Sequence, residues 1–430
     1  MLFDSLNRHM LPPYGGNYVS APNFTRLAEH AVVYDNSWVG SMPCIPARGE
    51  LHTGRYNFLH RGWGPLEPFD DSMPEMLKAN GVYAHLVTDH QHYFEDGGAT
   101  FHTRYSSWEF FRGQEGDAWK GQVADPQIPD VLVAHEKPMW RQDWVNRQHM
   151  RSEADQPQTR TFDAGIEFMR INARDDRWFL QIECFDPHEP FFTQQHYKDL
   201  YPHDYDGPHF DWPAYAPATE DERVLQHARA EYAALVSMCD RSLGRVLDEM
   251  DALELWDDTM LVVCTDHGFL LGEHGWWAKN LQPFYNEIAR TPLFIWDPRS
   301  GRRGERSDAF VQMIDVPTTL LDFFGIASTP DMQGVAIAED GRDAARGRGL
   351  FGSFGAHVNI TDGRYVYMRA STRPENGPLF EYTLMPTRIW RRFSVEELSG
   401  ATLAEPFSFT KGVRTLRVPG FAHAGLQRFG

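Results

Sequence analysis

The stretch Cys44-Ile45-Pro46-Ala47-Arg48-Gly49-Glu50-Leu51-His52-Thr53-Gly54-Arg55 says more about the fold than any other dozen residues of the chain. It predicts a loop that passes into a helix, with Gly54 placed to end that helix. A cysteine two residues before a proline and four before an arginine also fits a small buried thiol beside a turn. The surrounding sequence therefore has to decide between a structural and a chemical role.

The composition indicates a packed globular protein. The chain has 430 residues, 42% of them hydrophobic and 23% charged, which suits one large domain with an appendage or two domains. Its net charge is −19, from 41 basic and 60 acidic residues. We therefore expect no nucleic-acid partner and no anionic membrane partner, because no basic stripe could neutralise phosphates.

Four cysteines in a chain of this length form no disulfide framework. Cys184 and Cys264 lie in apolar runs and are expected to be inert core thiols. The sequence has no apolar run of about 18 residues and no secretory signal. As given, it predicts a cytoplasmic protein.

The N-terminus qualifies that prediction. Met1-Leu2-Phe3 leaves only three residues for a strand ending before Asp4, against about five or six in an ordinary strand. We hypothesise that the first strand is truncated. In that case a periplasmic or secreted location becomes possible.

Strand patterns alternate with helix patterns, which predicts an α/β fold with a mostly parallel sheet flanked by helices. Residues 93–155 lack periodicity and are expected to form an irregular insertion over the active site. The predicted strands are 82–88, 178–185, 259–265 and 291–296. The predicted helices are 23–34, 44–53, 73–81 with a capping box at Ser72, 220–253, and 316–324 closed by Gly325.

The sequence changes character after about residue 335. Residues 359–367 predict a β-hairpin around Asp362-Gly363. We therefore expect a catalytic α/β domain over 1–335 and a smaller C-terminal α+β subdomain over 336–430 that carries antiparallel strands.

Polar, ionisable residues follow several predicted strands, where parallel sheets bind ligands. Asp4 follows the first strand, Asp186-Pro187-His188-Glu189-Pro190 the strand ending at Phe185, and Asp266-His267-Gly268 the strand ending at Thr265. Asp266 and His267 offer an oxygen and a nitrogen to a metal ion. Lys279 lies 13 positions after Asp266, across a glycine-rich turn, and could return to the same pocket. Taken singly, each fits a capping Asp, a loop His or a surface Lys.

Taken together and in this order, these segments resemble the formylglycine-dependent sulfatases of the alkaline-phosphatase superfamily over about residues 1–335. The resemblance covers Asp4, the C-x-P-x-R-x4-T-G-R motif from Cys44, the His-x-Pro loop, Asp-His-Gly and Lys279. It extends to Glu287, Arg290, Pro292 and Leu293 before the next strand. It also implies the alkaline-phosphatase-like fold.

The resemblance implies specific roles. Cys44 would be converted to formylglycine, the nucleophile, by a formylglycine-generating or an anaerobic sulfatase-maturating enzyme. One divalent ion, Ca²⁺ first and Mn²⁺ or Mg²⁺ as alternatives, would be held by Asp4, the modified Cys44, Asp266 and His267. Arg48 and Lys279 would neutralise sulfate oxygens, and His188 would contact the leaving-group oxygen. The substrate would be a small-molecule or carbohydrate sulfate ester, and an oligomer is possible.

Two positions depart from the family pattern. The family often has two adjacent acidic residues at the N-terminal metal site, whereas Ser5 follows Asp4 here. The family's Lys-x-His appears as His90-Gln91-His92, with His92 on the family His and His90, a substrate-binding candidate, on its Lys. Because His titrates near 6.5, we expect activity that depends strongly on pH between 5 and 8. His90, His92 and Asp89 could alternatively form a transition-metal site.

Two other functions stay open at this level. A phosphonate monoester or phosphodiester hydrolase would use the same site, and Ser5 suits that group. A catalytically silent scaffold would keep Cys44 unmodified and bind only a metal and an anion. Several tryptophans could stack on a sugar or an aryl group, although such residues more often fill a core; these are Trp108, Trp119, Trp140, Trp276 and Trp277.

Overall fold

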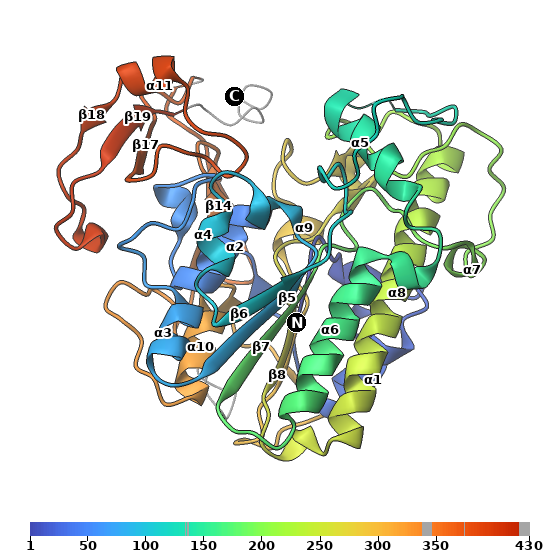
Figure 1. The fold of residues 1–430 in the computed structure, drawn as a ribbon, viewed down its shortest axis with the longest axis horizontal. Coiled ribbons are helices and arrows are strands. Elements are labelled where there is room, and N and C mark those ends of the chain that lie inside the picture. The colour runs from blue at the N-terminus through green and yellow to red at the C-terminus, as the bar shows by residue number, and fades with distance from the viewer. Residues whose placement is uncertain (134, 136, 338–345, 374, 421–430) are drawn as a thin grey trace.

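The central sheet has eight strands in the order β12-β2-β11-β8-β1-β7-β5-β6 (Figure 1). The computed structural model describes residues 1–133, 135, 137–337, 346–373 and 375–420. Neighbouring strands pair in parallel, except that β11 is antiparallel to β2 and β8. The predicted mostly parallel α/β sheet is confirmed. The strands are β1 (Leu2–Phe3), β2 (Val32–Tyr34), β5 (Tyr83–Thr88), β6 (Ser107–Phe110), β7 (Trp178–Cys184), β8 (Leu261–Thr265), β11 (Leu293–Trp296) and β12 (Glu305–Ser307).

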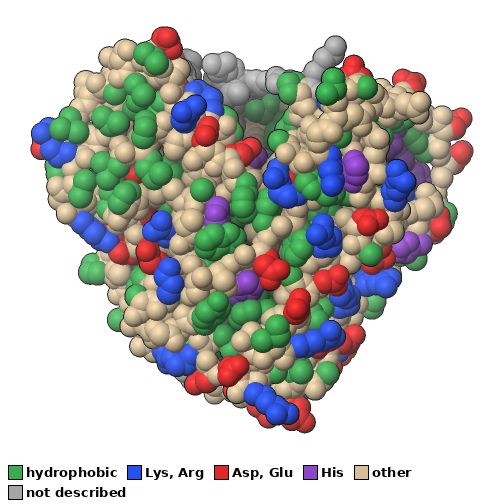
Figure 2. All heavy atoms as spheres, viewed as in Figure 1, with side chains coloured by type: hydrophobic (Ala, Val, Ile, Leu, Met, Phe, Trp, Pro, Cys, Tyr) green, Lys and Arg blue, Asp and Glu red, His purple; other side chains and the backbone are tan. Residues whose placement is uncertain are grey.

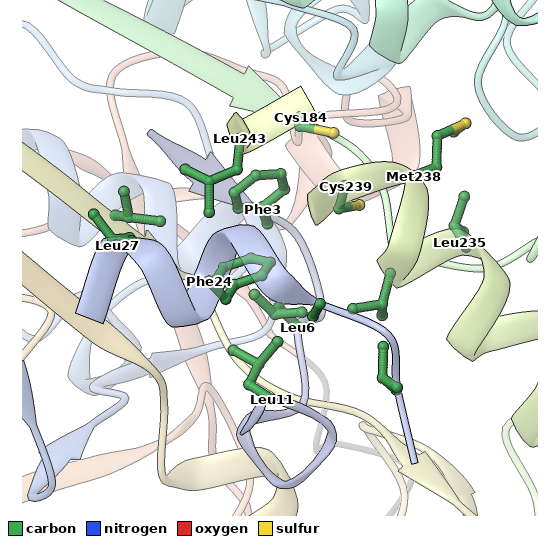
Figure 3. Close-up of a cluster of buried hydrophobic side chains, with 14 of the residues drawn as sticks. Phe3, Leu6, Leu11, Phe24, Leu27, Cys184, Leu235, Met238, Cys239 and Leu243 are labelled. Carbon is green, nitrogen blue, oxygen red and sulfur yellow. The ribbon is translucent and has the colours of Figure 1, made fainter. Parts of the chain in front are cut away.

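Helices cover both faces of the sheet (Figure 1). One face carries α1 (Pro22–His30), α6 (Pro157–Asn172) and α8 (Glu222–Ala252), and the other carries α2 (Cys44–Thr53), α3 (Met73–Ala79) and α10 (Asp315–Phe323). Strand β1 shows how the two cores form. Its Phe3 packs with α1 and α8, near Phe24 and Cys239 (Figure 3), whereas Leu2 belongs to the core on the opposite face. Successive side chains of a strand point to opposite faces, so a central strand needs apolar residues on both.

Local sequence explains several helix ends. The Asp221 carboxylate accepts hydrogen bonds from the backbone N–H groups of Arg223 and Val224, and α8 begins there. Helix α2 ends as predicted at Gly54, whose φ of 59° is left-handed and therefore favours glycine. Gly325, with φ of 70°, follows α10 in the same way.

The described C-terminal residues form antiparallel strands, as expected. The predicted hairpin is β15 (Val358–Thr361) with β16 (Val366–Arg369). Strand β14 (Gly349–Ser353) pairs with β15 and also with β4 (Ser41–Met42), which lies just before Cys44. A three-stranded sheet holds β17 (Phe380–Thr383), β19 (Leu416–Pro419) and β18 (Thr402–Leu403). The boundary at 335/336 stays a prediction, and residues 338–345, 374 and 421–430 of that predicted subdomain lie outside the described residues.

Three predictions about local structure are wrong. The helix predicted over 23–34 ends at His30, and Val32–Tyr34 forms β2. Ser72 makes no capping hydrogen bond to α3; its Oγ lies 2.8 Å from His52 Nδ1 instead. The predicted irregular segment 93–155 contains the sheet's edge strand β6 and helices α4 (Ala99–His102) and α5 (Lys137–Arg147).

The shorter elements connect this framework. They include α7 (Gln195–Lys198), α9 (Asn286–Ala289), α11 (Val395–Ser399) and two small pairs, β3 (Ser37–Trp38) with β13 (Val311–Gln312) and β9 (Leu270–Leu271) with β10 (Trp277–Ala278). Among the described residues, no helix combines the length and apolar composition needed to cross a bilayer. On the face shown in Figure 2, acidic and basic side chains are interspersed.

Candidate active site

The predicted site residues meet at one edge of the sheet. Asp4 follows β1, His188 follows β7, Asp266 and His267 follow β8, and Cys44 begins α2. Strands β1, β7 and β8 are parallel, so their carboxyl ends lie at the same edge. The structure therefore places together residues that are up to 263 positions apart in the sequence.

Asp4, Cys44, Asp266 and His267 form a buried cluster whose candidate ligand atoms all lie within 4.8 Å of one another. Cys44 Sγ is 3.3 Å from His267 Nε2 and 3.7 Å from Asp4 Oδ1. The four residues are those that the sequence predicted as metal ligands.

The donor set fits a divalent cation. Asp4 Oδ2 is buried, accepts no hydrogen bond and lies 2.9 Å from Arg48 Nη1, so it could still offer a lone pair to a cation. His267 Nδ1–H donates to the Gly268 carbonyl over 2.9 Å, so Nε2 carries the lone pair and faces the cluster. Two carboxylates suit a hard cation such as Ca²⁺, Mg²⁺ or Mn²⁺.

Arg48 is fully buried among three carboxylates. Its Nη1 lies 2.9 Å from Asp4 Oδ2 and 2.5 Å from Asp266 Oδ2, and its Nε donates to Glu183 Oε1 over 2.8 Å. Burial alone would lower the pKa of Arg48, but these carboxylates raise it well above its ordinary value. Arg48 is therefore a fixed positive charge beside Cys44.

Lys279 returns to the site as the spacing suggested, at the end of the β9–β10 pair. It is 1% exposed, and its Nζ donates to Ser5 Oγ over 2.8 Å. Ser5 Oγ in turn donates to Asp4 Oδ1 over 2.7 Å. Burial lowers the pKa of Lys279, but Cys44, Glu189 and Asp4 together raise it. The residue that departs from the family pattern thus connects Lys279 to a predicted metal ligand.

The unmodified Cys44 thiol is a poor nucleophile. Burial, reinforced by the Asp4 charge, raises the pKa of this thiol well above its ordinary value. The thiolate is the reactive form of cysteine, so near neutral pH this side chain stays protonated.

His90 and His92 occupy different environments. His90 Nε2 lies 3.6 Å from Asp4 Oδ2, and burial lowers the pKa of His90 well below its usual value. His90 therefore stays neutral near pH 7, which argues against titration of this residue between pH 5 and 8. The expected pH dependence of activity stays a prediction. Burial also lowers the pKa of His92, but the hydrogen bond and charge of Glu95, 2.6 Å from Nδ1, outweigh it and raise that pKa.

The alternative transition-metal site is not formed. Asp89 accepts hydrogen bonds from Phe185 N–H and Gln114 Nε2–H, over 2.7 and 2.8 Å. Among the described residues, it groups with Cys184 and Asp186 rather than with the two histidines.

Sequence reasoning missed two buried carboxylates. Glu183 accepts from Arg48, Gln181 Nε2–H and Tyr93 OH. Glu189 lies between His188 and Lys279. The signal for Glu183 was present, because Gln181 and Glu183 put polar groups on one face of an otherwise apolar strand. Glu189 lies in the segment that the sequence analysis singled out after Phe185, but no role was predicted for it.

An aromatic pair near His92 was also missed. Trp63 packs edge-on against His92, with ring centroids 5.2 Å apart, and Trp390 packs against Trp63 at 5.3 Å. Trp390 is 46% exposed, whereas Trp277, a predicted stacking candidate, is buried in the core. Ile389 N–H donates to the Trp63 carbonyl over 3.0 Å, so the C-terminal segment is fixed to this side of the site.

Comparisons with known proteins agree with this geometry. The model of the Sulfatase family matches residues 1–326. The chain is 23% identical to an arylsulfatase of Clostridium perfringens, covering 84% of this chain and 83% of the relative, and 24% identical to a choline-sulfatase of Rhizobium meliloti, covering 90% and 80%.

Two solved structures show the same fold. One is a protein in complex with its substrate D-glucosamine-2-N,6-O-disulfate, with a TM-score of 0.66, 17% identity, and coverage of 86% of this chain and 88% of that one. The other is the phosphonate monoester hydrolase of Agrobacterium radiobacter, with a TM-score of 0.67, 18% identity and 86% coverage of each chain. The sheet is that of the alkaline-phosphatase-like fold. Because the family model spans most of the chain, the protein belongs to the sulfatase family.

Proposed function

We propose that the protein hydrolyses a sulfate ester, with formylglycine at position 44 as the nucleophile and one divalent cation, Ca²⁺, beside it. The observation that carries this proposal is the position of Cys44 Sγ, which lies among Asp4, Asp266 and His267. Arg48 donates to Asp266, and Lys279 is joined to Asp4 through Ser5. Mn²⁺ and Mg²⁺ suit the same ligands.

The chemistry explains why this site needs so much positive charge. The oxygens of a sulfate monoester carry negative charge and repel an oxygen nucleophile. When formed, the hydrated formylglycine supplies one hydroxyl that attacks sulfur and a second whose deprotonation later expels sulfate. The cation would offset the repulsion and favour deprotonation.

The remaining roles fall to the chain's own residues. Arg48 is held by Asp4, Asp266 and Glu183, so it offers fixed positive charge without reorganisation. Lys279 Nζ donates one proton to Ser5 Oγ and supplies a second charge, whose other protons would contact a sulfate oxygen. His188 donates its Nδ1 proton to the Glu189 carbonyl over 2.6 Å, which leaves Nε2 for the leaving-group oxygen. On the β5 side, His90 lies beside Asp4, and the His92 ring lies next to that of His90.

Burial constrains how Cys44 is modified. Its thiol is 3% exposed, and every residue of α2 is buried. A formylglycine-generating or anaerobic sulfatase-maturating enzyme would therefore act before this segment folds, because the folded chain hides the thiol.

The alcohol part of the substrate would lie against the Trp63–Trp390 pair. Exposed aromatic surface next to His92 suits the apolar face of a sugar or an aryl ring. A small-molecule or carbohydrate sulfate ester fits this arrangement.

A phosphonate monoester or phosphodiester hydrolase is the second candidate. Ser5 favours it, because a hydroxyl replaces the second acidic residue that sulfatases often carry next to the metal, and the fold alone does not separate the two groups. Arg48 and Lys279 would bind phosphate oxygens equally well.

A substrate panel tests both candidates. The protein is produced with a maturating enzyme and assayed on nitrophenyl sulfate, a sugar sulfate, and a phosphonate monoester and phosphodiester with the same nitrophenyl leaving group. We expect sulfate ester turnover that disappears in Cys44→Ala and persists in Cys239→Ala, which removes a buried thiol outside the site. Faster turnover of the phosphorus esters by orders of magnitude would reverse the order of the candidates, and no turnover of any ester would favour the catalytically silent scaffold.

A further inference from the structure

Glu189 is a buried carboxylate between two groups that the proposed reaction needs. It is 1% exposed, and its Oε2 lies 3.2 Å from His188 Nδ1 and 3.6 Å from Lys279 Nζ. Oε2 has no hydrogen-bond partner within normal geometry. A buried carboxylate oxygen without a hydrogen bond is costly, so this atom calls for an explanation beyond packing.

Tyr215 fixes the other oxygen of this carboxylate. Its hydroxyl donates to Glu189 Oε1 over 2.5 Å, and that bond orients Oε2 toward His188 and Lys279. Burial raises the pKa of Glu189, but His188, Lys279 and the Tyr215 hydrogen bond outweigh it and lower the pKa. Glu189 is therefore a fixed negative charge at neutral pH.

The Glu189 charge acts on His188, whose ring is held in one orientation. His188 Nδ1–H donates to the Glu189 carbonyl, so the ring has its Nδ1 proton fixed and its Nε2 directed elsewhere. Its ring packs on Phe185 at 4.3 Å between centroids, which limits rotation. Burial lowers the pKa of His188 below its usual value. Of the charges that face it, Glu189 and Asp4 partly offset this by favouring the imidazolium, and Lys279 opposes it.

We propose that Glu189 is a positioning residue that keeps His188 able to donate a proton to the leaving alcohol and holds Lys279 toward the sulfate. This inference rests on the proposed function. In the step concerned, the nucleophile's oxygen bonds to sulfur while the bond from sulfur to the alcohol oxygen breaks. The electron pair of the broken bond stays on that oxygen, and His188 Nε2 supplies its proton.

The dependence of activity on the leaving group therefore tests the role of Glu189. A nitrophenolate leaves readily without a proton, whereas a methylphenolate needs one. Replacing Glu189 by the isosteric, neutral Gln removes the charge that stabilises the imidazolium and keeps the side chain's size. Loss of activity should grow as the leaving group becomes poorer, which loss of general stability would not cause.

The experiment compares wild type and Glu189→Gln on phenyl sulfates that run from nitro- to methyl-substituted. We expect kcat/KM to stay within about threefold of wild type for nitrophenyl sulfate and to fall about a hundredfold for methylphenyl sulfate. The alkaline limb of the pH profile should move down by about one pH unit, because less His188 stays protonated. Glu231→Gln is the matched control, since Glu231 is also buried and pairs with a lysine, Lys198, outside the site. Any fall in kcat/KM that this control shows should be the same for every leaving group.

A uniform loss across the series with an unchanged pH profile would overturn the proposal. If Glu189→Gln does not fold, Tyr215→Phe carries the test, because it removes the bond that orients the carboxylate and should give a smaller loss with the same dependence on leaving group. A uniform effect of Tyr215→Phe would contradict it equally. Failure of wild type on every phenyl sulfate and on the sugar sulfate of the substrate panel would instead refute sulfate ester hydrolysis, and this inference would fall with it.

Discussion

Glu50 should make the protein less stable as the pH rises, and Glu50→Gln should remove the part of that dependence that Glu50 causes. Glu50 lies on α2, fully buried, and its Oε1 accepts from Ser41 Oγ over 2.6 Å while Oε2 has no partner. Burial raises the pKa of Glu50 from 4.5 to about 8. The folded state therefore binds this proton more tightly than the unfolded chain, and the stability it contributes is complete below pH 4.5 and is lost as pH rises toward 8.

The magnitude follows from the two pKa values. The free energy of unfolding falls by up to about 1.4 kcal/mol for each pH unit between them, and by less close to either value. Wild type should therefore lose about 3.5 kcal/mol between pH 5 and pH 8 that Glu50→Gln keeps. A Gln at this position retains the acceptor for Ser41. Its buried amide N–H₂ costs about 1–3 kcal/mol at every pH, so the difference in slope carries the prediction rather than the absolute stability.

Urea unfolding at pH 5, 6, 7 and 8 measures this difference. Other buried carboxyls, Asp89 and Asp143 among them, also have pKa values raised to about 7 by burial, but they are common to both proteins and cancel in the comparison. Glu405→Gln is the control, because the Glu405 side chain is 82% exposed and its replacement should leave the pH dependence of wild type unchanged. Parallel stability curves for wild type and Glu50→Gln would refute the reasoning.

The remaining predictions concern the site. Removing the divalent cation with a chelator should abolish ester hydrolysis and lower Tm. Restoring the cation at a hundred times its Kd should raise the free energy of unfolding by about 2.7 kcal/mol. A Tm that does not respond to any divalent ion would contradict the Asp4–Asp266 site. Ser5→Asp should lower the Kd for Ca²⁺ by calorimetry, because a carboxylate replaces the hydroxyl beside Asp4, and an unchanged Kd would place Ser5 outside the ion's reach. Trp390→Ala should raise KM for a sugar or aryl sulfate about tenfold with little change in kcat, since stacking contributes about 1–1.5 kcal/mol; equal KM values would remove this residue from the substrate site.

Local sequence patterns were enough to predict those features that depend on neighbouring residues in the sequence. Gly54 ends α2 because a left-handed residue there needs no long-range partner. The positions of Asp4, Asp266 and His188 followed from a general rule, since the carboxyl ends of parallel strands meet at one edge.

Other features depend on contacts that no short window contains. Val32–Tyr34 follows a helical pattern without a break, and it is a strand because β11 and β12 pair with it. The partners of Arg48 and Glu189 could not be predicted for the same reason, since Glu183 is 135 positions from Arg48 and Tyr215 is 26 positions from Glu189. The neutral state of His90 likewise reflects burial, which the residue type does not encode.

The mass of the peptide that contains Cys44 tests the central claim most directly. The protein is produced in a host that modifies a control sulfatase, digested, and the peptide spanning Cys44 is analysed by mass spectrometry. The account predicts that sulfur is lost at this position and an aldehyde oxygen replaces it. An intact, alkylatable thiol at Cys44 in that host would contradict it.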